Sequence, residues 1–513
     1  MGKFLRFLFS RVVIVVLLIA VQAAVLFLTI WQLSNDYVYV YACFSLLSLL
    51  VALWVINDAS DSPEFKLAWV VPILIFPVFG GLFYLLFRGG RMSRREQEAM
   101  EQLMAESRSL LTQQEDVLKQ LASASPAAAR QSVYLERAAN YPVYQNTETT
   151  YFSPGEDYFA ALKQELQKAE RYIFLEFFII DEGVMWQEIL DILQAKVQQG
   201  VEVRVMYDDF GSIMLLPATY PRKLEAMGIQ CVRFNTFRPW LDLRMNYRDH
   251  RKICVIDGHT AFTGGINLAD EYINAREVHG HWKDSGLMVR GEAVWNMAIM
   301  FLELWNGCRW RTPDEGFEQY RPLGMPQDLQ PSGFVQPFGD SPLDHEQVGE
   351  SAYLQVLNYA TDYVYINTPY LIVDNDLMTA LKLAAKRGVD VRIVTPGIAD
   401  KWYVHLMTRS YYAPLMEAGV KIYEYTPGFI HAKSFVSDDT TAIVGSINLD
   451  YRSLYHHFED AVWLYQTASI AQIKADFLQT LPVCRPISYE DTRKVGFFTR
   501  LLRSLIRLFA PLM

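Results

Sequence analysis

The N-terminal part of the chain holds three long apolar stretches. Residues 12–31, 38–56 and 68–87 carry no charged side chain, and each is about twenty residues long, the length that an α-helix needs to cross the core of a bilayer. Helices buried in a soluble core usually keep one polar face, and these stretches have none. The pattern predicts a membrane anchor with two to three hydrophobic spans over residues 1–90.

Basic residues flank these stretches on both sides. Lys3, Arg6 and Arg11 precede the first, and Arg88 and Arg91 follow the third. Because segments rich in Lys and Arg stay cytoplasmic, we expect a multi-pass protein of the cell membrane with its catalytic domain in the cytoplasm. Three full crossings would separate the two flanks, so one stretch is expected to be interfacial or re-entrant.

Residues 91–132 differ sharply from the apolar stretches. Residues 93–123 contain no Gly or Pro and are rich in Glu, Gln, Leu, Met and Arg, which favours a surface helix. Residues 124–129 (ASPAAA) are typical of a linker. The segment is predicted to be a linker helix that joins the anchor to a globular part starting near residue 133.

From residue 133 onwards, segments with the periodicity of strands and helices follow one another twice in the same order. The expected strand–helix–strand units are 171–180, 185–199 and 200–209 in the first half, and 362–372, 375–387 and 388–397 in the second. A repeat of this size indicates one supersecondary unit used twice. The predicted fold class is α/β, with two halves at 133–325 and 326–487 preceded by transmembrane helices.

Residues 488–513 are predicted to form a basic amphipathic tail. Arg500, Arg503 and Arg507 recur at helical spacing among Phe, Leu and Ile residues. Such a helix suits the surface of an anionic membrane. A helix packed on the globular part with a solvated arginine face explains the spacing equally well, so both alternatives stay open.

Charge and cysteine content narrow the function classes. The net charge is −10, whereas nucleic-acid-binding proteins normally carry a basic surface, so no nucleic-acid partner is expected. The five cysteines include no C-x-x-C pair, so neither a disulfide framework nor a zinc site is indicated.

One string of eighteen residues occurs in both halves. Residues 250–267 (HRKICVIDGHTAFTGGIN) and 431–448 (HAKSFVSDDTTAIVGSIN) are identical at nine positions. Along a strand, side chains alternate between faces, so His250 and Lys252 share a face while Asp257 lies opposite, and the next strand returns Asn267 to the first side. The second string repeats this arrangement with His431, Lys433, Asp438 and Asn448.

Two such sets facing each other would offer two imidazoles, two ammonium groups and two amides. Ammonium and amide donors suit the charged oxygens of a phosphoryl group, and two imidazoles suit a displacement in two steps, one attacking phosphorus and the other moving the proton. His279 with His281, and His456 with His457, suggest a metal site instead, but neither pair recurs in the other half. No metal or other cofactor is expected.

The doubled pattern H-x-K-x4-D-x6-G-[G/S]-x-N resembles the paired motif of the phospholipase D superfamily, and the whole chain resembles the bacterial cardiolipin synthases. Residues 66–87, 264–272 and 367–371 are also typical of that family. The resemblance implies a duplicated phospholipase D-like domain with mixed sheets. It also implies a phosphatidyltransferase at the lipid bilayer that joins two phosphatidylglycerol molecules into cardiolipin and glycerol through a phosphohistidine.

The resemblance also implies roles for single residues. His250 would be the nucleophile and His431 the general acid and then base, and Asp257 and Asp438 belong to the motif. The phosphate would be held by Lys252, Lys433, Asn267 and Asn448.

An acidic residue downstream of each string would orient the histidines. Glu459 lies eleven residues after Asn448; the same spacing in the first half falls on Val278, so Asp284 is expected there, after a short insertion. Gly265 stands where the family usually has Ser.

Other functions keep the same motif. A membrane-bound phospholipase D-type hydrolase, or another phosphatidyltransferase such as a phosphatidylserine synthase, would need the same residues. The acidic charge and the anchor disfavour a nuclease, and the two intact His-Lys-Asn sets disfavour a catalytically silent scaffold. Whether the protein forms an oligomer is left open by the sequence.

Overall fold

The computed structural model describes residues 38–58, 63–76 and 94–512 except 237–246, 311–315 and 345, together with the single positions 24, 27, 28, 31, 32, 80, 81, 84 and 85. The predicted span 12–31 therefore lies outside the described residues but for four isolated positions, and the predicted span 68–87 is described only in part.

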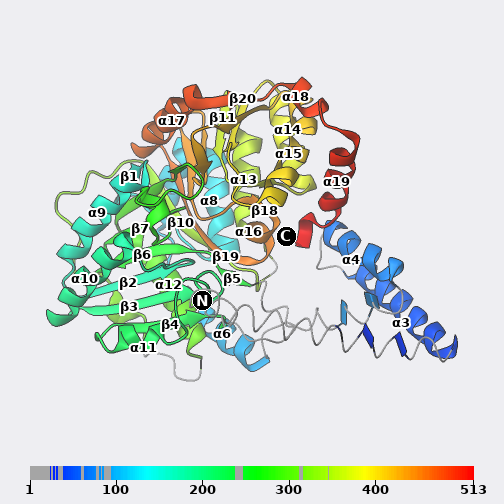
Figure 1. Cartoon of the computed structure of the whole chain (residues 1–513). Helices are drawn as coiled ribbons and strands as arrows, with labels where there is room; N and C mark the ends of the chain where they lie inside the picture. The colour runs from blue at the N-terminus through cyan, green and yellow to red at the C-terminus, as the bar shows by residue number, and fades with distance from the viewer. Residues whose placement is uncertain are drawn as a thin grey trace.

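Two N-terminal helices project from the main body, and the second of them packs against it through Phe65. They are α3 (Val38–Asn57) and α4 (Pro63–Ile75), and in Figure 1 they extend towards the lower right, away from the sheets. Val51, Val55 and Ile73 pack together between them. Among the residues that the structure describes, no helix is both long and apolar enough to span a membrane.

Three helices, rather than one helix and a linker, occupy the region after the gap. They are α6 (Arg94–Arg108), α7 (Glu115–Ala124) and α8 (Pro126–Ala139). The expected linker at 124–129 is instead the start of α8, because the Ser125 hydroxyl accepts the backbone N–H of Ala128 at 3.2 Å and Pro126 occupies the first helical position. Leu121 and Leu135 are fully buried, so this segment belongs to the core.

The first half is built on a seven-stranded mixed sheet. Its order is β1 (Thr147–Phe152), β9 (Gly286–Gly291), β7 (Thr260–Gly264), β6 (Lys252–Ile256), β2 (Tyr172–Phe177), β3 (Glu202–Asp208) and β4 (Gln230–Phe234). The helices of this half are α9 (Gly155–Lys168), α10 (Val184–Gln198), α11 (Tyr220–Glu225) and α12 (Val294–Cys308). Two short strands, β5 (Arg248–Asp249) and β8 (His281–Lys283), pair outside the sheet.

The second half repeats this order. Its sheet runs β10 (Phe334–Asp340), β19 (His457–Tyr465), β17 (Thr441–Gly445), β16 (Ser434–Ser437), β11 (Tyr363–Asn367), β13 (Asp390–Pro396), β14 (Lys421–Tyr425) and β20 (Cys484–Pro486). The helices are α13 (Val348–Tyr359), α14 (Asn375–Lys386), α15 (Trp402–Met416), α16 (Tyr451–Tyr455), α17 (Ser469–Thr480), α18 (Tyr489–Arg493) and α19 (Phe497–Leu508). Short strands β12 (Leu371–Ile372), β15 (Gly428–Ile430) and β18 (Leu449–Asp450) complete it.

The seven shared strands have the same order and the same parallel or antiparallel pairings in both sheets. This confirms the predicted α/β fold with a duplicated, mixed-sheet architecture. The predicted strand 362–372 is divided into β11 and β12, because Pro369 lies in the interval and proline cannot donate to a strand ladder.

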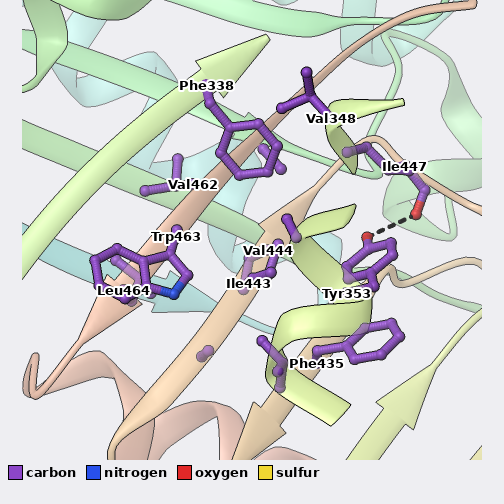
Figure 2. Close-up of a cluster of buried hydrophobic side chains, with 14 of the residues drawn as sticks. Phe338, Val348, Tyr353, Phe435, Ile443, Val444, Ile447, Val462, Trp463 and Leu464 are labelled. Carbon is purple, nitrogen blue, oxygen red and sulfur yellow. Dashed lines mark hydrogen bonds between the residues drawn. The ribbon is translucent and has the colours of Figure 1, made fainter. Parts of the chain in front are cut away.

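The core of the second half fixes the backbone beside the repeated string. Figure 2 shows Tyr353 of α13 next to Phe435 of β16; the two rings stack with centroids 4.0 Å apart. The Tyr353 hydroxyl donates to the carbonyl of Ile447 at 3.1 Å, and Ile447 directly precedes Asn448. Core packing therefore fixes the position of Asn448, a candidate residue for binding the substrate phosphate.

Candidate active site

The two histidines lie where the halves meet. His250 sits between β5 and β6, and its backbone N–H donates to the carbonyl of Phe458 in the other half at 2.9 Å. His431 sits between β15 and β16 and donates likewise to Lys283 at 2.7 Å. Two parallel ladders that cross between the halves, β5 with β19 and β15 with β8, hold these segments in register.

Each imidazole is bound by a carboxylate of the opposite half. The Nδ1 atom of His250 lies 2.8 Å from Oε1 and 3.0 Å from Oε2 of Glu459. The Nδ1 atom of His431 lies 2.7 Å from Oδ2 of Asp284. The sheet register makes the two acids equivalent. Asp284 lies two residues before the strand partner of Gly264, and Glu459 lies two residues before the strand partner of Gly445, the matching glycine of the second string.

Glu459 has a longer side chain than Asp284, and the residue next to each carboxylate differs accordingly. The Ser446 hydroxyl donates to Oε2 of Glu459. At the equivalent Gly265, a Cβ atom would lie 2.1 Å from Oδ1 of Asp284, far inside van der Waals contact. Glycine at position 265, where the second string has Ser446, therefore leaves the space that the Asp284 carboxylate occupies.

The two lysines are buried beside the histidines. The ammonium group of Lys252 donates to the carbonyl of His250, and that of Lys433 donates to the carbonyl of His431. Burial disfavours the charged form of an amine. It lowers the pKa of Lys252 to about 8 and that of Lys433 to about 7.

Burial also keeps the imidazoles neutral. It lowers the pKa of His431 to about 4, with Lys433 adding to the effect, and it lowers the pKa of His250 well below its usual value. Burial alone would raise the pKa of the two acids, but His250 holds the pKa of Glu459 below its usual range and His431 does the same for Asp284. The resting site thus pairs neutral imidazoles with carboxylates.

The two asparagines are placed differently. The Asn267 carbonyl accepts the backbone N–H of Ile179 at 3.0 Å, and its amide donates to the Tyr272 hydroxyl at 2.7 Å. The carbonyl oxygen of Asn448 is buried without a hydrogen-bond partner in the part of the chain that the structure describes. The Asn267 amide is thus engaged by Tyr272, whereas the Asn448 amide donates no hydrogen bond to any residue that the structure describes, which leaves its N–H groups for a ligand.

Asp257 and Asp438 lie away from the imidazoles, just after β6 and β16. Asp257 accepts three backbone N–H groups, those of residues 170–172, at 2.8–2.9 Å. Asp438 accepts those of residues 361–363 at 2.7–3.0 Å. Each carboxylate therefore ties the turn after the motif strand to the start of the neighbouring strand.

The histidine pairs considered as metal ligands do not act as pairs. His281 Nδ1 lies 2.9 Å from the Tyr425 hydroxyl, and the ring of His456 packs on Phe65 with centroids 5.0 Å apart. Only His457 approaches the site. Its ring lies 5.3 Å from that of His250, and among the described residues these two with Glu459 form one of two clusters of side chains close enough to hold a metal ion.

Sequence comparison places both halves in one family. Residues 162–288 and 353–481 match the family model described as cardiolipin synthase, PLD-like domain, and residues 46–89 match that described as phospholipase D-nuclease N-terminal. A protein named cardiolipin synthase from Geobacillus thermodenitrificans is 35% identical over 519 residues, covering 98% of this chain and 99% of the relative. The chain belongs to the cardiolipin synthase family. It is a phosphatidyltransferase of the phospholipase D type, as the resemblance of its motifs implied.

Further relatives agree with this assignment. An uncharacterized protein of Streptococcus mutans is 44% identical over 461 residues, covering 90% of this chain and 99% of the relative. Among solved structures, phosphatidylserine synthase of Haemophilus influenzae superposes with a TM-score of 0.56 at 14% identity, covering 74% of this chain and 97% of that chain. At that identity the likeness concerns the fold alone.

The two motif aspartates can be tested for a direct role. We expect Asp257→Ala to lower the free energy of unfolding by roughly 2–4 kcal/mol, because three backbone N–H groups lose a charged acceptor. Phosphatidyl transfer per folded molecule should fall by less than about tenfold, since the carboxylate does not touch the imidazoles. Urea unfolding and activity normalised to folded protein measure the two effects.

Lys252→Met, on the same strand, provides the contrast for that experiment. Its activity should fall by about a thousandfold or more, because the role predicted for Lys252 is to stabilise the charged phosphoryl oxygens in the transition state. An equally deep loss in folded Asp257→Ala protein would give Asp257 a direct part in catalysis.

The buried lysines predict an alkaline limit to activity. The ammonium forms of Lys433 and Lys252 are lost as the pH rises through about 7 and about 8. We expect kcat/KM for phosphatidyl transfer to fall as the pH rises above about 7, because kcat/KM reports the free enzyme. Initial rates at constant ionic strength measure the profile, and an undiminished kcat/KM at about pH 9 would contradict it.

Proposed function

We propose that this family member synthesises cardiolipin from two molecules of phosphatidylglycerol through a phosphohistidine. The observation that carries the proposal is the pair of crossed contacts, His250 with Glu459 and His431 with Asp284. Each contact occupies Nδ1, and within the described residues no hydrogen bond engages Nε2 of either ring. Both rings thus keep one nitrogen for chemistry.

Two displacements follow from this arrangement. In the first, Nε2 of His250 attacks phosphorus, the bond to the headgroup glycerol breaks, and His431 gives its proton to the departing oxygen. In the second, a hydroxyl of another phosphatidylglycerol attacks the phosphohistidine, His431 takes the hydroxyl proton, and the phosphorus–nitrogen bond breaks. Lys252, Lys433 and Asn448 would stabilise the phosphoryl oxygens throughout.

Burial of the site supports transfer to a lipid alcohol over hydrolysis. Lys252, Asp284 and Glu459 are fully buried, and the two histidines are nearly so. A site that excludes water protects a reactive intermediate from hydrolysis. Product analysis separates the alternatives, since phosphatidic acid without cardiolipin would indicate a hydrolase.

The tail helix α19 supports contact with a membrane surface. It packs beside α15 (Figure 1), and the Arg507 guanidinium lies 4.6 Å from the centre of the Tyr411 ring. Phe497 and Phe498 point into solvent with 73% and 83% of their surfaces exposed. Exposed aromatic residues next to arginines fit the interface of an anionic bilayer. A face of arginines turned to solvent, the other explanation of the tail, would not expose these phenylalanines.

The two-histidine mechanism predicts different defects for its two members. His250→Ala and His431→Ala should each abolish cardiolipin formation from phosphatidylglycerol in mixed micelles. With a phosphatidyl ester of p-nitrophenol, whose leaving group needs no proton, His431→Ala should still release p-nitrophenol, whereas His250→Ala should not. Chromatography of the lipids and absorbance of the released phenol are the measurements.

His259→Gln serves as the control, because that histidine lies at the far end of β6. It should leave both reactions near the wild-type rate. Near-normal cardiolipin formation by either alanine variant would refute the two-histidine mechanism.

The role proposed for α19 predicts a defect confined to bilayer substrates. Replacing Phe497 and Phe498 together by Ser should raise the half-saturating concentration of phosphatidylglycerol vesicles by about tenfold or more, because each buried phenylalanine contributes roughly 1.5–3 kcal/mol. Activity on dispersed short-chain phosphatidylglycerol should not change. Leu323→Ser is the control, since Leu323 is 84% exposed but lies outside the tail. Equal behaviour of the two variants on vesicles would exclude the role.

A further inference from the structure

The two His–carboxylate pairs are not equivalent, because Glu459 serves more than one imidazole. Its Oε1 atom lies 2.8 Å from Nδ1 of His250 and 3.5 Å from Nδ1 of His457, and its Oε2 atom accepts the Ser446 hydroxyl. In the part of the chain that the structure describes, the only side chain that donates to Asp284 is that of His431. One carboxylate is shared and the other is not.

The sheet register identifies what the first half has in place of His457. Trp282 lies two residues before Asp284, as His457 lies two residues before Glu459. Their rings also occupy corresponding places: Trp282 lies 5.4 Å from the His431 ring and His457 lies 5.3 Å from the His250 ring. An indole has no basic nitrogen, so only the His250 side has a second imidazole.

His457 is buried, and its only polar contact within the described structure is with Glu459. It is 9% exposed, and neither ring nitrogen forms a hydrogen bond to a described residue. The charged and titratable groups around it are Glu459 on its own strand, His250 and Arg248 from the opposite half, and His456, Asp450 and Arg452 just before it. Its ion-pair contact is with Glu459.

We propose that His457 is a positioning residue that makes the two histidines unequal: by sharing Glu459, it keeps His250 the weaker base and thereby directs His250 to attack phosphorus and His431 to carry the proton. The proposal rests on the two-histidine transfer described above. It adds a residue that the motif does not contain and a physical reason for the division of roles between two nearly identical strings.

The chemistry follows from competition for one oxygen atom. A carboxylate stabilises the protonated form of the imidazole that it binds. A second imidazole next to the same carboxylate oxygen weakens that stabilisation. Asp284 contacts only one imidazole, so its charge stabilises protonated His431 alone. After burial itself, the nearby His457 is among the groups that lower the pKa of His250. When a phosphodiester anion binds and the site takes up a proton from the solvent, the proton is expected on His431, and His250 keeps a free electron pair for attack.

The experiment compares His457→Leu with His457→Asn in the full-length protein. Leucine keeps volume and removes both nitrogens, so His250 should become more basic and the acid limb of the kcat/KM profile should move up by about 0.5–1 pH unit. The yield of phosphatidylated His250 in turnover quenched with denaturing detergent at neutral pH should fall with it. Asparagine retains a hydrogen-bond donor near the Nδ1 position, so the acid limb of the kcat/KM profile should return to its wild-type pH. His456→Leu is the matched control, because that imidazole packs on Phe65 instead.

The reciprocal variant Trp282→His tests the same idea from the other half. It places a second imidazole beside Asp284, so His431 should become the weaker base and be protonated less, and the rate should fall more with phosphatidylglycerol than with the p-nitrophenyl ester. This variant keeps the idea testable even if His457→Leu does not fold.

An unmoved acid limb in folded His457→Leu, or a Trp282→His variant that slows both substrates equally, would overturn the role of His457. Failure of the transfer reaction itself would appear differently, as wild-type protein that makes no cardiolipin.

Discussion

The crossed contacts between imidazole and carboxylate are the constraint on which the site depends. His250 is held by Glu459 and His431 by Asp284, each from the opposite half. The same crossing occurs in the backbone, where β5 pairs with β19 and β15 with β8. Neither half contains a complete histidine–acid pair, so the site forms only when the two halves are in contact. Duplication here builds one site at a shared edge and not two sites.

Local parts of the site could be predicted from the sequence because they depend on strand alternation. The separation of Asp257 from His250 follows from the spacing within one strand and its turn, and the structure shows it. Asp284 could be chosen over Val278 only by assuming an insertion, and the register of β7 with β9 removes that ambiguity.

Other features depend on contacts between residues far apart in the chain. Nothing in the spacing shows that the acids are exchanged between halves, because the pairs join residues 209 and 147 positions apart. The equivalence of His457 and Trp282 becomes visible only once the two sheets are superposed by their strand pairings. The error at residues 124–129 is different in kind, since Ser125 and Pro126 are a local helix-start signal that the alanine-rich composition obscured.

The burial of so many ionisable groups also has a consequence for catalysis. Glu459 and Asp284 balance the charges of Lys252 and Lys433, while burial keeps both imidazoles neutral. A phosphodiester brings one negative charge into a site with little water to screen it. Uptake of one proton restores the balance, and an imidazole is the group that can accept it. In the proposed mechanism substrate binding therefore charges the general acid, so the acid is ready only when there is a leaving group to protonate.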